Sequence, residues 1–156
     1  MTRDGIIVDT QLLVLFVVGL TRRSYIEKHK RLRAYTVDDF DLVYQIVSGF
    51  TKVIVTPNTL SEASSFVRQV GEPIRSEIYA TFGHLTAAEV YVASRIAVAE
   101  AEFCRLGLTD TVLLSDDLAA YPLVTADLDL YLAALSRGRD AFNFHHLRDH
   151  GWDVRP

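Results

Sequence analysis

The sequence predicts a single α/β domain over residues 1–156, a three-layer α/β/α sandwich with a central parallel sheet. Two observations lead to this class. Short apolar runs at residues 6–8, 53–55 and 121–125 alternate with longer segments of helical periodicity. The hydrophobic fraction of 49% also suits a sheet that is covered by helices on both faces.

The first half of the chain begins with an expected strand at residues 5–9, which ends on Asp9, and continues into a buried helix at residues 10–20. A second helix is expected to start at Thr36, a favoured capping residue followed by two acids in the first turn, and to end at Gly49. The side chains of this helix expected to point inward are Phe40, Val43, Tyr44 and Val47.

The middle of the chain starts with an expected second strand at residues 53–55. Thr56 then caps a helix that has Pro57 at its first position. A break at residues 71–73 precedes a further helical stretch. The sequence Thr-Ala-Ala-Glu at residues 86–89 matches a capping box, so we expect a long helix that ends near Gly107. Its expected buried positions are Val90, Ala93, Ala97, Ala101 and Cys104.

The last third of the chain continues the alternation. Thr109 is expected to cap a helix, with Asp110 in its first turn. We expect a strand at residues 121–125, a helix from 128 to 137 that ends at Gly138, and a last strand at 141–144. A polar tail follows, and it holds His145, His146 and His150.

Charge and cysteine content restrict the setting of the protein. The net charge is −4, so bulk charge gives no sign of nucleic-acid binding, although a cluster of metal-binding acids would itself lower that charge. Cys104 is the single cysteine, which excludes an internal disulfide and suits a reducing cytoplasm. The apolar run at residues 12–20 is shorter than the ~20 residues a membrane span needs. We therefore expect a soluble cytoplasmic protein.

Four acids occupy comparable places in the predicted elements: Asp9, Glu62, Asp110 and Asp127 each follow a strand or lie near a helix start. Helix capping is the simpler role for Asp110 and Asp127 taken singly. Asp9 directly follows a buried strand, where a carboxylate needs a partner or a metal. If the four converge, they would repel one another without a cation, and an all-oxygen set favours Mg²⁺ or Mn²⁺.

Four segments resemble the acidic motifs of PIN-domain ribonucleases, in order and spacing and over nearly the whole chain. They are Ile-Ile-Val-Asp-Thr, Thr-Pro-Asn-Thr-Leu-Ser-Glu, Leu-Gly-Leu-Thr-Asp and Leu-Val-Thr-Ala-Asp. The resemblance implies a PIN-like α/β/α sandwich, a site for one or two metal ions, and hydrolysis of RNA phosphodiester bonds. Many small members are toxins of the VapC type, which implies a possible antitoxin partner and a homodimer.

The resemblance also implies roles for individual residues. Asp9 would be the central metal ligand, and Glu62, Asp110 and Asp127 would complete a catalytic, metal-binding set. Thr10 and Thr125 would support the site by hydrogen bonds, and Asn58, four residues before Glu62, would orient it. Independently of the resemblance, the charges of the basic run predict that it guides RNA, through Arg22, Arg23, Lys28, Lys30 and Arg31; the alternative for this run is a solvated helix face.

Partners and competing functions remain open at this level. Large apolar residues nearly encircle the helix at residues 10–20, which favours packing against a second chain; alternatively, this helix is central and covered by the chain's own residues. A phosphoacceptor receiver would need an acid pair after the first strand and a lysine after the last, yet Lys52 is the last lysine. A catalytically inactive PIN-like binding or regulatory module is the remaining alternative.

Overall fold

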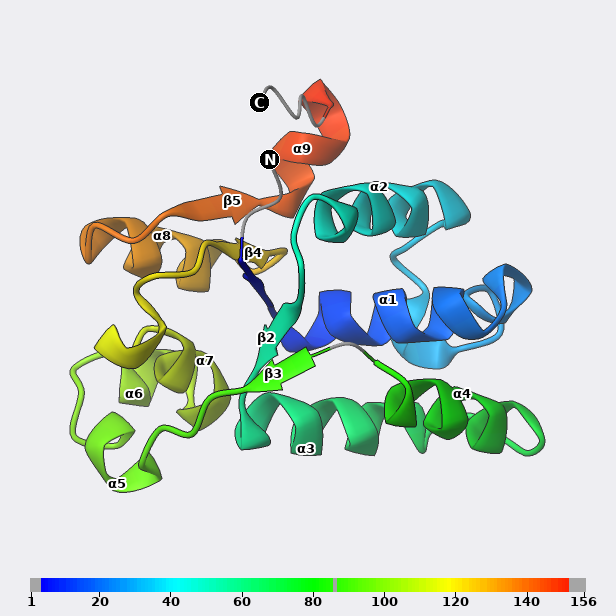
Figure 1. The fold of residues 1–156 in the computed structure, drawn as a ribbon, viewed down its shortest axis with the longest axis horizontal. Coiled ribbons are helices and arrows are strands. Elements are labelled where there is room, and N and C mark those ends of the chain that lie inside the picture. The colour runs from blue at the N-terminus through cyan, green and yellow to red at the C-terminus, as the bar shows by residue number, and fades with distance from the viewer. Residues whose placement is uncertain (1–3, 86, 152–156) are drawn as a thin grey trace.

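The computed structural model describes residues 4–85 and 87–151. Its centre is a five-stranded, all-parallel sheet in the order β3-β2-β1-β4-β5 (Figure 1). The strands are β1 (Ile6–Val8), β2 (Val53–Val55), β3 (Ala87–Glu89), β4 (Leu123–Thr125) and β5 (Ala141–Asn143). The predicted fold class, an α/β/α sandwich with a parallel sheet, is confirmed.

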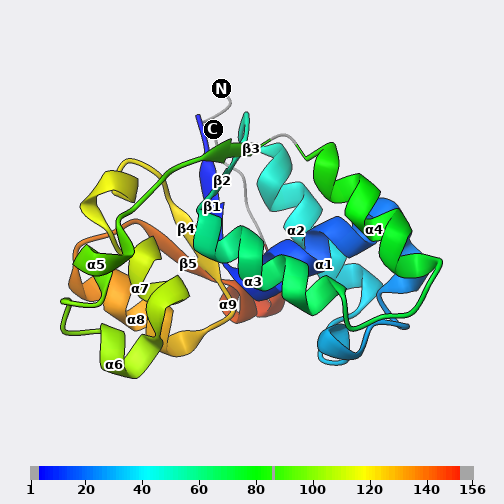
Figure 2. The same ribbon diagram turned by 90° about the horizontal axis from the view of Figure 1, so that it is seen from below.

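Helices cover both faces of the sheet. The nine helices within the described ranges are α1 (Thr10–Thr21), α2 (Val37–Ser48), α3 (Pro57–Val67), α4 (Ile74–Gly83), α5 (Ser94–Ala97), α6 (Phe103–Leu106), α7 (Leu108–Leu113), α8 (Leu128–Ser136) and α9 (Phe144–His150). Seen from below, the sheet separates α1 to α4 from α5 to α8 (Figure 2). Two apolar cores result, one on each face.

Alternation along the strands explains the two cores. Ile6 and Val8 of β1 belong to the core beneath α1, whereas Ile7 between them belongs to the opposite core. Successive side chains of a strand point to opposite faces, so a wholly apolar strand supplies both cores at once. All three residues of β1, β2 and β4 are buried, as a sheet covered on both faces requires.

Helix α1 is the central helix of its layer. Every residue from Leu12 to Val18 is at most 6% exposed, because α2, α3 and α4 surround the helix. The argument for a second chain drawn from this helix is therefore wrong, and the alternative, a helix covered by its own chain, holds. Gly19 allows part of this packing, since a Cβ built there would lie 2.1 Å from Cδ2 of Phe40.

The caps and part of the burial pattern predicted in this layer are confirmed, and the predicted position of Tyr44 is wrong. Thr36 and Asp39 form a reciprocal capping box at the start of α2, and Thr56 caps α3 with Pro57 at its first position. Phe40 and Val43 of α2 are buried as predicted. Tyr44, predicted to point inward, is 50% exposed, and its ring lies at the edge of the cluster formed by Phe16 and Phe40.

The long helix predicted after residue 86 does not form. Ala87–Glu89 is instead the edge strand β3, paired in parallel with β2, and only the short helices α5 and α6 follow. Pairing with an open sheet edge overrides the helix propensity of the alanines. Ala97 is buried as predicted, but Ala101 and Cys104 are exposed. Thr86, the predicted cap, lies outside the described residues.

The C-terminal part also differs from the prediction of a polar tail. Residues 144–150 form α9, which is capped by Asn143, and the last strand ends at Asn143 instead of residue 144. Phe144 is fully buried and anchors α9 against the core. His145, His146 and His150 thus lie on a helix, where all three are exposed. No helix in the described ranges is both long and apolar enough to cross a membrane.

Candidate active site

Two of the four acids, Asp9 and Asp127, lie where the strand order reverses. From β1 the chain adds β2 and β3 on one side, then returns to add β4 and β5 on the other side. In open parallel sheets, ligands bind outside the carboxyl ends of the strands at such a reversal point. Here that point lies between β1 and β4. Asp9 directly follows β1, and Asp127 comes two residues after the end of β4.

Asp9 is held in one orientation by three hydrogen bonds. One carboxylate oxygen accepts the backbone N–H of Leu12 at 3.0 Å, which makes Asp9 the N-cap of α1. The other oxygen accepts the backbone N–H of Ala126 at 2.9 Å and a short hydrogen bond from the Thr125 hydroxyl. The side chain is 5% exposed, and burial raises the pKa of its carboxyl group while these hydrogen bonds lower it.

Asp127 lies across the reversal point from Asp9 and caps α8 by accepting the backbone N–H of Leu130 at 3.0 Å. Its own backbone N–H donates to the Thr125 hydroxyl at 3.0 Å. Thr125 therefore makes the supporting hydrogen bond expected of it. The simpler reading of Asp127 as a helix cap also holds, and its exposed side chain still contributes negative charge next to Asp9.

Glu62 lies one turn into α3 and is oriented from another element. One of its carboxylate oxygens accepts the Thr109 hydroxyl at 2.9 Å. Thr109 is therefore not the cap predicted for α7, whose N-cap is Gly107 with a positive φ of 80°. Asn58, expected to orient Glu62, makes no hydrogen bond to it within the described part of the chain. The sequence reasoning missed this role of Thr109, although its position next to Asp110 was a signal.

Asp110 is the acid whose pKa responds to the charges of the other three. It lies in the first turn of α7, as predicted, and is partly buried. Burial, and after it the negative charges of Asp9, Asp127 and Glu62, together raise the pKa of its carboxyl group to about 7. A carboxyl group with this pKa is about half protonated at neutral pH. Repulsion between the acids thus disfavours a state in which all four are ionised.

The chemistry of this donor set fits a hard divalent cation. Four carboxylates are all-oxygen ligands, and a cation would relieve the repulsion recorded at Asp110. The side chains are not drawn together as a finished ligand shell: among the described residues, no three His, Cys, Asp or Glu form a group that could hold a metal ion as they stand. Instead, one carboxylate oxygen of Asp9 accepts a hydrogen bond from the Thr125 hydroxyl, and one of Glu62 accepts a hydrogen bond from the Thr109 hydroxyl.

Two further residues border the acids. Thr10 is 5% exposed, and its hydroxyl has no hydrogen-bond partner within the described ranges, so the support predicted from Thr10 is not seen. Tyr35 was not singled out for this site. Burial raises the pKa of its phenol to about 12, and the charge of Asp9 acts in the same direction. Its ring packs against Phe144, with centroids 6.2 Å apart.

The five predicted RNA-binding residues separate into two places. Arg22 is the C-cap of α1, one helix length of roughly 18 Å from the N-cap Asp9. Arg23 next to it forms a two-pronged ion pair with Asp41, and the Lys28 ammonium group lies over the ring of Tyr25. Lys30 and Arg31 belong to a 3₁₀ turn, Lys30–Leu32, that packs back against α1. The run is thus exposed, but it is not one helix face.

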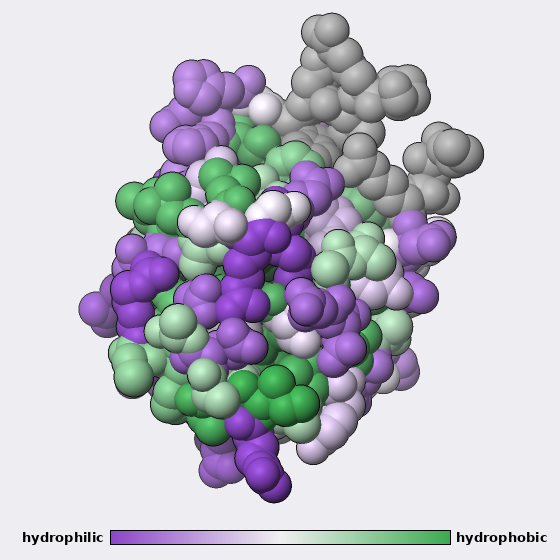
Figure 3. Space-filling model, turned by 90° about the vertical axis from the view of Figure 1, so that its left-hand side faces the viewer, coloured by the Kyte–Doolittle hydropathy of each residue, from purple (hydrophilic) through white to green (hydrophobic). Residues whose placement is uncertain are grey.

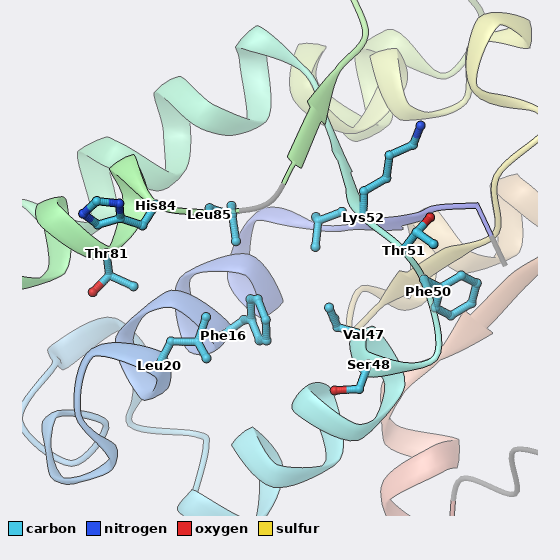
Figure 4. A pocket seen from close by; sticks show the side chains of 11 residues that line it. Phe16, Leu20, Val47, Ser48, Phe50, Thr51, Lys52, Thr81, His84 and Leu85 are labelled. Atoms are coloured by element: carbon cyan, nitrogen blue, oxygen red, sulfur yellow. The ribbon is translucent and has the colours of Figure 1, made fainter. Parts of the chain in front are cut away.

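One hollow of about 390 Å³ lies away from the acids. It opens between the second half of α1 and the ends of α2 and α4, next to the start of β2, which is the opposite edge of the sheet from Asp9 (Figure 4). Phe16, Leu20, Val47 and Leu85 make much of its wall, and Lys52 points away from it. This hollow has no part in the site formed by the four acids.

No protein-family model, curated protein or solved structure matches the chain.

Proposed function

We propose that this chain is a metal-dependent endoribonuclease that hydrolyses RNA phosphodiester bonds, with Asp9, Glu62, Asp110 and Asp127 holding Mg²⁺ or Mn²⁺. Two observations support the proposal: Asp9 and Asp127 follow the strands on either side of the reversal point of a parallel sheet, and the negative charges of Asp9, Asp127 and Glu62 raise the pKa of Asp110. The resemblance of the four segments to PIN-domain motifs supports the same function.

The protein residues have separable tasks in this proposal. Asp9 is the fixed member, since three hydrogen bonds hold it. Glu62 and Asp127 each carry a carboxylate oxygen that accepts no hydrogen bond from a described residue and is available to a ligand. A bound divalent cation would polarise the phosphate and lower the pKa of a coordinated water. Attack by water leaves the ribose 2′-OH unused, so the expected product carries a 5′-phosphate.

The test is cleavage of a single-stranded RNA oligonucleotide labelled at one end, with Mg²⁺, with Mn²⁺ and with excess chelator. We expect cleavage only with the metals. Asp9→Asn should abolish the cleavage, and Asp129→Asn is its matched control. Asp129 is an exposed acid on α8 that faces Arg105 at 3.8 Å, so its loss should leave cleavage unchanged. Cleavage that survives chelation, or a product with a 2′,3′-cyclic phosphate, would refute the proposed mechanism.

The alternative is a catalytically inactive binding or regulatory module. One observation favours it: within the described residues the acids do not form a finished ligand shell. Calorimetric titration with Mn²⁺ separates the two, because the inactive module should bind no metal at the acids. A role as the toxin of a toxin–antitoxin pair, an antitoxin partner and a homodimer follow from the resemblance alone and stay predictions.

A further inference from the structure

Arg31 is held by a stacking contact and one hydrogen bond, which together leave its two Nη groups without a hydrogen bond to a described residue. Its guanidinium group lies 4.3 Å from the ring centroid of Phe66 on α3. Its Nε donates a hydrogen bond to the side-chain oxygen of Gln69 at 2.9 Å, just beyond the end of α3. The side chain is exposed, yet stacking and the hydrogen bond fix the plane of the guanidinium group.

Two contacts tie Arg31 to elements that carry the acids. Phe66 follows Glu62 by four residues, so both lie on one face of α3, about 6 Å apart along the helix axis. The side-chain amide of Gln11 donates to the backbone oxygen of Arg31 at 3.3 Å, and Gln11 lies in the first turn of α1, two residues after Asp9. Arg31 is thus anchored between the first turn of α1, which Asp9 caps, and the second half of α3, the helix that carries Glu62.

We propose that Arg31 binds a backbone phosphate of single-stranded RNA next to the phosphate that is cleaved. Its Nη groups make no hydrogen bond to a described residue, and a guanidinium group whose Nε is occupied still presents them to a phosphate oxygen pair. An acidic site in a chain of net charge −4 repels RNA, so a fixed cation beside it has a specific use. This inference rests on the proposed function.

The other basic residues are less suited to this role. Both Nη groups of Arg23 already donate hydrogen bonds to the two carboxylate oxygens of Asp41. Arg22 stacks on Tyr25 with 5.5 Å between its guanidinium carbon and the ring centroid, but it lies at the far end of α1 from Asp9. Arg22 therefore provides a matched control. It is the same residue type and is also stacked on an aromatic ring, but it lies at the C-terminal end of α1, whereas Arg31 contacts the first turn of that helix.

The experiment compares the wild-type protein with Arg31→Ala, Arg31→Lys and Arg22→Ala. Binding of a fluorescein-labelled single-stranded RNA is measured by anisotropy across a salt series, with Ca²⁺ in place of Mg²⁺, and cleavage kinetics are measured with Mg²⁺. For Arg31→Ala we expect a salt slope that is smaller by about 0.7, the value for one lost phosphate contact. We also expect KM to rise roughly ten-fold, within the range for a lost charged contact, with little change in kcat.

The remaining variants separate binding from folding. Arg31→Lys should restore the salt slope but not the full affinity, because a lysine keeps the charge and loses the planar fork. Arg22→Ala should leave the salt slope and KM close to the wild-type values, an outcome that would contradict the RNA-binding role predicted for Arg22 from the sequence. An unchanged slope and KM in Arg31→Ala, in a protein that binds RNA, would overturn the inference. If the wild type binds RNA without cleaving it, the slope still tests Arg31 while the nuclease proposal fails; if it does not bind RNA, both fail.

Discussion

The hydroxyl group of Thr125 donates a hydrogen bond to the carboxylate of Asp9, from a strand and a helix start that are remote in the sequence. The same hydroxyl oxygen accepts the backbone N–H of Asp127 at 3.0 Å. One buried side chain therefore sets the orientation of Asp9 and the backbone position of Asp127 together. The two acids at the reversal point of the sheet are coupled through a single threonine.

Thr125→Val should reduce both stability and activity. The substitution keeps the shape of the side chain but removes a donor from the buried Asp9 and an acceptor from Asp127, which typically costs about 1–3 kcal/mol. Urea denaturation measures the loss, and RNA cleavage should fall with it. Thr125→Ser keeps the hydroxyl group and is the control. Equal unfolding free energies for valine and threonine at this position would contradict the coupling.

Asp9→Asn should abolish cleavage while the protein stays folded. An amide in place of the carboxylate weakens the metal site, and it turns one acceptor oxygen into a donor that faces the donors of Leu12 or of Thr125 and Ala126. The substitution also removes the cost of burying a charge, because burial disfavours the ionised carboxylate of Asp9 and raises its pKa. The two effects oppose each other, so the unfolding free energy should change by no more than roughly 2 kcal/mol. Circular dichroism and urea denaturation check this; an unfolded variant would make Asp9 a structural residue.

The metal-free protein should lose stability as the pH rises from about 4 to about 7. The pKa of Asp110 is raised from 3.8 to about 7 in the folded protein, so between these values the folded state binds more protons than the unfolded state. The stabilisation is complete below pH 3.8 and is lost as the pH passes 7. About 4 kcal/mol is its upper limit, reduced by solvent screening because Asp110 is only partly buried.

Urea denaturation at several pH values measures this effect. Asp110→Asn should remove the part of the pH dependence that Asp110 contributes, and it should be more stable than the wild type at pH 8 in the presence of chelator. Adding Mg²⁺ at pH 8 should stabilise the wild type and have little effect on the variant. A stability profile that stays flat between pH 4 and pH 7 would mean that the acids do not converge as described.

Gly19→Ala should destabilise the layer around α1. A Cβ at Gly19 would lie 2.1 Å from Cδ2 of Phe40, and three atoms of that ring lie within 2.5 Å, so a rigid side chain must move. Overpacking of this kind typically costs about 1–3 kcal/mol. Gly83→Ala is the control, since a Cβ there meets no atom within 4 Å. Thermal denaturation of both variants checks the prediction, and equal midpoints would contradict it.

The surface over α5 to α8 combines hydrophilic and apolar residues (Figure 3). Leu128, Leu132 and Leu135 of α8 are each at least 45% exposed and follow one another at helical spacing. Together with the exposed Ile96 of α5, these residues offer apolar side chains to a second chain on this side of the protein, whereas α1 is covered. Sedimentation analysis of the wild type tests whether it self-associates.

Local chemistry determined much of this protein. The strands β1, β2 and β4 and the caps at Thr36 and Thr56 were predictable because apolar runs and capping hydrogen bonds involve residues close in sequence. The positions of the four acids at strand ends and helix starts were predictable for the same reason. The placement of Asp9 and Asp127 at the same end of the sheet followed from its parallel strands, whose carboxyl ends all point the same way.

Tertiary structure alone decided the remainder. Ala87–Glu89 has little strand propensity, and it became β3 because the edge of β2 offered backbone hydrogen bonds. Thr109 was as well suited to cap a helix as to bind Glu62, and the packing of α7 beside α3 selected Glu62. The same holds for α1 and Arg31: which surfaces cover a helix, and which ring lies under a guanidinium group, depend on contacts between residues far apart in the chain.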